Sequence, residues 1–140
     1  MRWVTRQRAK VDRIACPWLI RNFIDPDAVF VFLPPDTDWA AVSDGIVFDV
    51  PECELGHHGA ECSFDAIMRK YQLADPALVE LAKIVRSADT TDRSWAPEGA
   101  GLEAIADGFR RIARDDHDNL ALQFCVYDAL YAHCQARVKG

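Results

Sequence analysis

The stretch GIVFDVPECELGHHGAECSFDAIMRKY, residues 45 to 71, contains a change from a β-type pattern to a helical one. Its first seven residues form a short β-rich run, and two similar runs precede it, RWVT at residues 2 to 5 and AVFVFLP at residues 28 to 34. After Ser63, a suitable N-cap, apolar residues recur at helical spacing on one face: Phe64, Ile67, Met68 and Tyr71. We therefore expect an α+β fold, in which a small N-terminal sheet of about three strands packs against a mostly helical body.

Helical patterns fill the rest of the chain, and no strand is expected beyond Ser63. CPWLIRNFI, residues 16 to 24, is helical by its pattern, with Pro17 acceptable only in a first turn. Asp75-Pro76 and Pro97 open two further helices. The last helix carries a packing seam, which places Cys125 and Cys134 in the core as inert thiols. No repeat or linker divides residues 1 to 140, so we predict a single domain.

Composition places the chain among globular proteins, since 50% of its 140 residues are hydrophobic and 27% are charged. The longest apolar run, AVFVFL, is far shorter than the roughly 20 residues that span a bilayer. The first residues lack a signal-peptide core, so we expect a cytoplasmic protein with no membrane partner. The five cysteines are odd in number and form no regular framework, so disulfides are not expected.

Charge is unevenly distributed along the chain, although the net value is −6. Six basic residues face one acid in the first 21 positions, and the remainder holds 10 basic and 21 acidic side chains. The acidic body disfavours nucleic acid as a direct partner. The basic segment suits a small anion or, alternatively, is a solvated edge. A homodimer is an open alternative to a monomer.

The segment ELGHHGAECSFD, residues 54 to 65, concentrates metal-ligand and titratable side chains and is interrupted by two glycines, one on each side of the histidine pair. Adjacent histidines on a turning backbone usually point apart, so we expect one to enter a polar pocket and the other to bind a backbone or carboxylate group. Imidazole with thiolate favours zinc or another divalent transition metal. The candidate metal ligands are His57, His58, Cys62 and Asp65. The alternative is an ordinary turn, with Asp65 complementing the helix dipole.

The second concentration is KVDRIACPWLIR, residues 10 to 21. At the start of a predicted helix, Cys16 would have a lowered pKa, and nearby cations would act in the same direction. This segment is expected to form the wall opposite the histidines, where arginines would hold a small oxyanion. The candidate ligand-binding residues are Lys10, Asp12, Arg13, Cys16 and Arg21. A purely structural Cys16 is the alternative.

Two polar loops offer further candidates. SADTTDRS, residues 87 to 94, holds Asp89 and Asp92, which could reach a shared cation or simply cap helices. In RDDHDN, residues 114 to 119, His117 could fold back toward His58. His133 is expected to be exposed or at the core edge. The chain has no phosphate-binding glycine loop and no HExxH or G-x-S-x-G motif.

Taken together, four stretches are characteristic: residues 3 to 32, FDVPECELGHHGAECSFDA at 48 to 66, IVRSADT at 84 to 90 and VYDALYA at 126 to 132. They resemble the C-terminal domain of the chromate resistance protein B family over nearly the full length. The resemblance implies a link to chromate-responsive regulation of a chromate efflux transporter. Regulatory members of that family carry an additional N-terminal region thought to contact DNA.

Three functions follow as hypotheses. The leading one is a metal- or oxyanion-binding sensor or accessory module linked to chromate or metal stress. The alternative is a redox or hydrolytic enzyme, with Cys16 or Cys62 as thiolate and His57 or His58 as base. The third is a plain interaction domain. Convergence of a histidine with Cys62, Asp12 and Arg13 on one pocket favours the first two.

Overall fold

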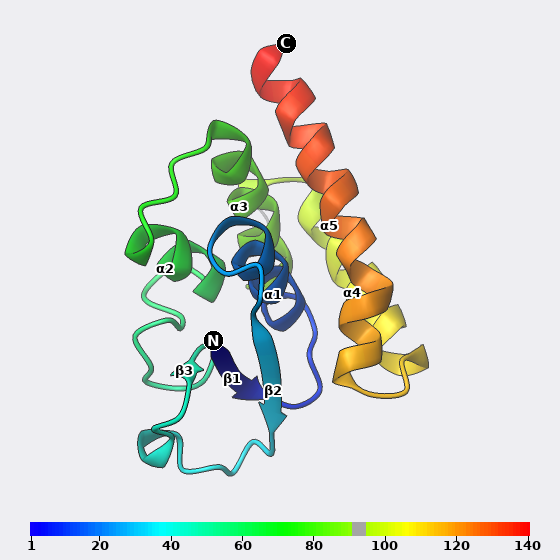
Figure 1. Cartoon of the computed structure of the whole chain (residues 1–140). Helices are drawn as coiled ribbons and strands as arrows, with labels where there is room; N and C mark the ends of the chain where they lie inside the picture. Colours follow the sequence, from blue (N-terminus) through cyan, green and yellow to red (C-terminus); the bar gives the residue numbers. More distant parts are fainter. Residues whose placement is uncertain (91–94) are drawn as a thin grey trace.

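The computed structural model describes residues 1–90 and 95–140 and shows a small sheet against a helical body (Figure 1). The elements in chain order are β1 (Arg2–Arg6), α1 (Asp12–Phe23), β2 (Val29–Leu33), the 3-10 turn η1 (Trp39–Ala41), β3 (Ile46–Val47), α2 (Ser63–Lys70), α3 (Pro76–Asp89), α4 (Glu98–Ile112) and α5 (Asp116–Lys139). The α+β expectation is confirmed, and within the described residues no strand follows Ser63.

The three strands are parallel, in the order β2-β1-β3. Arg2 lies opposite Val29 on one side of β1, and Trp3 lies opposite Ile46 on the other. The chain therefore places β2 along one edge of β1 and later returns to place β3 along the other edge. In parallel sheets, such a reversal opens a crevice at the carboxyl ends of the strands, where ligands commonly bind.

The first helix begins earlier than the sequence pattern predicts, at Asp12, so Pro17 lies inside it and not in its first turn. The helix is nonetheless retained, because its buried face packs into the core, with Trp18 only 2% exposed. The Trp18 ring lies 6.2 Å from Tyr127 and 5.6 Å from Tyr131 of α5. Tertiary packing thus outweighs the local disadvantage of an interior proline.

Helix starts follow local capping chemistry. Cys62, not Ser63, is the N-cap of α2. Its side chain accepts a hydrogen bond from the backbone N–H of Asp65, and the Asp65 side chain accepts one from the Cys62 N–H. At α3 the prediction is confirmed, since Asp75 accepts a 2.8 Å hydrogen bond from the Ala77 N–H and Pro76 is the first helical residue. Pro97 directly precedes α4.

The 24-residue helix α5 runs beside α3 and α4, and its C-terminal end extends past the body (Figure 1). Its predicted seam is present: Leu120, Tyr127 and Cys134 are buried. The prediction for Cys125 is wrong, because this residue is exposed. It follows Phe124 by one position, about 100° around the helix, and so leaves the seam. Within the described part of the chain, no helix combines the length and apolarity needed to cross a bilayer.

Candidate functional site

A polar cavity of about 280 Å³ lies at the carboxyl ends of β1 and β3, in the crevice that the strand order predicts. Its walls come from the segment after β1, the segment after β3, the histidine loop and the facing ends of α3 and α4. It is lined by Arg6, Lys10, Val11, Asp12, Arg13, Asp49, His57, Asp89 and Arg110. Acids, bases and an imidazole thus meet in one place.

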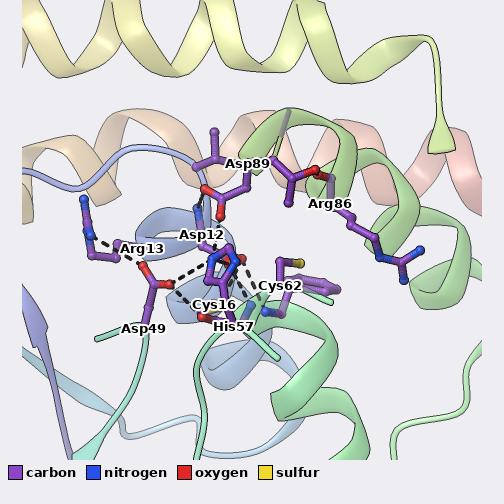
Figure 2. A network of polar contacts seen from close by, with 12 residues as sticks. Asp12, Arg13, Cys16, Asp49, His57, Cys62, Arg86 and Asp89 are labelled. Carbon is purple, nitrogen blue, oxygen red and sulfur yellow. Dashed lines mark hydrogen bonds and ion pairs between the residues drawn. The ribbon is translucent and has the colours of Figure 1, made fainter. Parts of the chain in front are cut away.

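The imidazole of His57 is at the centre of this group, and Figure 2 shows three carboxylates turned toward it. Its Nε2 lies 2.8 Å from Asp89 Oδ2 and 3.3 Å from Asp12 Oδ2. The third carboxylate, Asp49, is 3.5 Å away through Oδ1. Hydrogen bonds to Asp12, Asp49 and Asp89 raise the pKa of His57 to about 12. The ring therefore carries a proton at neutral pH in the metal-free protein.

Asp12 is completely buried and is positioned by backbone N–H groups. The N–H groups of Ser63 and Phe64, in the first turn of α2, donate to its two oxygens at 2.8 and 3.3 Å. Burial, followed by the neighbouring Asp89 carboxylate, raises the pKa of Asp12 to about 8. Burial and the neighbouring carboxylates thus disfavour the charged form of Asp12, and the His57 ring partly offsets this effect.

Asp49 lines the opposite side of the cavity and has a strained backbone conformation. Its φ of 50° lies in the left-handed region, which is uncommon for a residue other than glycine. The side chain accepts a 2.6 Å hydrogen bond from Ser63 Oγ and lies 3.5 Å from Arg13 and 3.8 Å from Arg6. Such strain persists where surrounding contacts enforce it, and it clusters at functional sites.

The four predicted metal ligands do not share one centre. His58 turns away, and its Nε2 contacts the Glu54 carbonyl oxygen at 2.7 Å. Cys62 is buried and donates from Sγ to Asp65 at 3.2 Å, while Arg86 holds Asp65 through two hydrogen bonds of 2.7 and 3.0 Å. Only His57 of the set enters the cavity.

A different group has metal-binding geometry. One ligand atom each from Asp12, His57 and Asp89 lies within 4.8 Å of the others; this is the candidate cluster found among residues 1–90 and 95–140. Asp89 was a sequence candidate as a loop carboxylate, whereas the structure places it at the end of α3. Its predicted companion Asp92 lies outside the described residues.

The predicted anion-binding residues separate into three groups. Lys10, Asp12 and Arg13 line the cavity. Arg21 does not: its guanidinium lies over Phe30 and Phe124, 5.1 and 5.5 Å from the ring centroids. Cys16 lies beneath the cavity, with Sγ 3.6 Å from Asp12 Oδ1.

The prediction of an activated thiol at Cys16 or Cys62 is wrong. Both side chains are fully buried, and burial followed by the charge of Asp12 raises the pKa of each thiol well above its ordinary value. Because α1 begins at Asp12, Cys16 lies beyond the first turn and faces a carboxylate instead of free N–H groups. Neither thiol is poised as a thiolate.

The remaining histidines lie outside the cavity. His117 packs edge-on against Phe32, with ring centroids 5.3 Å apart, instead of folding back toward His58. His133 is exposed, as expected, and lies 3.7 Å from Glu98.

Sequence reasoning missed three cavity residues as candidates: Arg6, Asp49 and Arg110. Asp49 could have been found, because it follows the predicted third strand, and the residues after parallel strands meet at one edge. Arg110 gives no such signal, since it reads as one of several charged positions on a helix.

Fold and site together define a small α+β domain with a polar cavity at the reversal point of a parallel sheet. The sequence profile described as "ChrB, C-terminal domain" matches residues 3–134, and the chain belongs to this family. A curated relative, Protein ChrB of Cupriavidus metallidurans, is 35% identical over 132 residues, which cover 94% of this chain and 40% of the relative. The chain thus spans about two fifths of the relative's length, and no solved structure matches it. The family resemblance seen in the sequence is confirmed.

Proposed function

We propose that this domain is a metal-binding sensor or accessory module of a chromate-resistance system, and that the cation binds between Asp12, His57 and Asp89. Family membership supports the biological setting. The observation that carries the proposal is the convergence of three ligand atoms, from three separate chain segments, within 4.8 Å of one another.

The donor set favours a divalent transition metal. Two carboxylate oxygens and one imidazole nitrogen suit zinc or manganese, and three protein ligands leave a position open for an exogenous group. A cation at this point would replace the His57 proton that the three carboxylates now share. The N–H groups of Ser63 and Phe64 would orient Asp12 as outer-shell partners.

The placement of the ligands suits a sensor. Asp12 begins α1, Asp89 ends α3, and His57 lies on a loop beside Gly59, whose φ is +62°. A cation joining these segments would favour the arrangement in which all three ligands are close, and so would shift the populations of their conformations.

The thiolate enzyme is less well supported than the sensor. Cys16 and Cys62 are buried, and the raised pKa values keep both thiols protonated at neutral pH. We further propose that the domain is cytoplasmic. Its partner would be a metal ion or small anion instead of nucleic acid, because acidic residues outnumber basic ones by 22 to 16.

The test is a calorimetric titration of the chelator-treated chain with zinc and, separately, with manganese. We expect His57→Gln and Asp89→Asn each to lower affinity by about 10-fold or more, since even outer-shell changes at metal sites cost about 10- to 100-fold. His133→Gln, at an exposed position on α5, is the matched control and should bind like the parent. The proposal would be refuted if the parent bound neither metal, or if a correctly folded His57→Gln variant bound metal as tightly as the parent.

A further inference from the structure

Arg110 is a cavity residue whose guanidinium makes no hydrogen bond or close ion pair with the described residues, although its charge helps to lower the pKa of Asp107, on the same helix. It lies in the last turn of α4 and lines the candidate metal cavity together with Lys10 and Arg13. No hydrogen bond or ion pair joins its guanidinium to a described side chain, and its buried Nε has no hydrogen-bond partner there. A guanidinium has five donors, so an unpaired one beside a cavity is suited to an incoming acceptor.

The other arginines of the cavity already have a carboxylate partner, although the buried Nε of Arg13 also lacks a hydrogen bond. Arg6 and Arg13 both lie near Asp49, and Arg13 also donates to the Arg8 carbonyl oxygen at 3.1 Å. Lys10 lies 4.0 Å from Glu103, a loose contact that leaves its ammonium near the cavity. Arg110 is therefore the cavity arginine without a close carboxylate partner among the described residues, and Lys10 lines the same cavity.

The charge balance changes once a cation is bound. A divalent ion would be neutralised by Asp12 and Asp89, while Asp49 is already compensated by Arg6 and Arg13. Arg110 then still has no close ion pair with a carboxylate among the described residues, since Asp107 acts on it only at longer range and is paired with Arg111. With three protein ligands, the cation also keeps an open coordination position.

We infer that the cavity binds a small tetrahedral oxyanion together with the metal, with one oxygen on the cation and others facing Arg110 and Lys10. This inference rests on the proposed metal site and adds its second ligand. It makes the two binding events interdependent: the oxyanion binds more tightly when the metal is present, and by linkage the metal gains the same factor from the oxyanion.

The probe is sulfate, a redox-inert tetrahedral dianion, titrated into zinc-loaded and zinc-free protein in a sulfate-free buffer. We expect sulfate to bind the zinc-loaded form about 10-fold or more tightly than the zinc-free form, as a charge-assisted contact to a cation requires. Zinc affinity should rise by the same factor when sulfate is present.

The decisive variant is Arg110→Gln. It should weaken sulfate binding to the zinc-loaded form about 10-fold, because a charged donor is lost. Zinc affinity measured without sulfate should be kept or increased, since a positive charge leaves the cavity. Arg111→Gln, the neighbouring position that is exposed and paired with Asp107, should match the parent in both measurements.

The outcomes separate the two proposals. If zinc does not bind, the proposed function fails and the joint site fails with it. If zinc binds normally but sulfate binds equally well without zinc, or Arg110→Gln binds sulfate like the parent, only the present inference is overturned.

Discussion

The cysteines illustrate, at the scale of single residues, how position on a helix decides side-chain chemistry. Cys16 lies one turn after Asp12 and faces its carboxylate from within the core, so both burial and charge disfavour the thiolate. Cys62 is buried as the N-cap of α2 and hydrogen-bonded to Asp65. Cys125, by contrast, lies on the solvent side of α5.

We predict that Cys125 is alkylated first when the native protein is pulsed with iodoacetamide, and that Cys16, Cys62 and Cys134 are labelled only after the structure opens. Accessibility and thiolate fraction together set the rate of this reaction. Mass-spectrometric mapping of labelled peptides gives the order. Early labelling of Cys16 or Cys62, before Cys125, would contradict the burial described above.

At the scale of elements, the contact between α3 and α4 depends on a glycine. A Cβ at Gly99 would lie 2.3 Å from Ser87 Cβ and 2.7 Å from the Ser87 carbonyl carbon. The same serine accepts a 2.9 Å hydrogen bond from the Ala96 N–H just before α4 begins. The start of α4 is thus placed against α3 at a separation that only glycine permits, and α3 ends at Asp89 in the cavity.

Gly99→Ala should therefore destabilise the protein by about 1–3 kcal/mol, the usual cost of overpacking a tight contact. Gly108→Ala is the matched control in the same helix, because a Cβ there meets nothing within 4 Å. It should stabilise by up to about 1 kcal/mol through helix propensity. Urea unfolding at equilibrium measures both changes. Equal effects of the two substitutions would show that the close approach is not limiting.

Features set by neighbouring residues could be predicted from the sequence, whereas those set by distant ones could not. The three strands and the Asp75-Pro76 helix start depend on local patterns and were predicted. The start of α1 was misplaced, because core packing around Trp18 retains a helix through Pro17. The cavity was only partly predicted, since strand order and helix packing bring Asp49 and Arg110 into the same cavity as His57.

At the scale of the whole molecule, the cavity links protonation to global stability. The pKa of Asp12 is raised from 3.8 to about 8, chiefly by burial, and that of His57 is raised from 6.5 to about 12 by its carboxylate partners. In both cases the folded state retains a proton that the unfolded chain releases. Stability therefore falls with rising pH across each interval, and both contributions fall between 6.5 and 8.

The melting temperature of the metal-free protein should accordingly decrease from pH 6.5 to about pH 9. His57→Gln should decrease less steeply, because one of the two retained protons is removed. His133→Gln, which alters a histidine outside the cavity, should follow the parent. Calorimetric scans in chelator-containing buffers supply the comparison, and a parent whose melting temperature stays constant or rises would rule out this coupling.

The convergence of Asp12, His57 and Asp89 also has a topological meaning. A ligand that joins them acts as a reversible cross-link, closing chain loops of about 45 and about 32 residues, and closing such loops restricts the unfolded ensemble. A ligand bound at these three residues would therefore oppose unfolding of the chain as a unit, including the parts of α1 and α3 that lie away from the cavity. Removing the ligand would release this restriction and so lower the free energy of unfolding, as reducing a disulfide does.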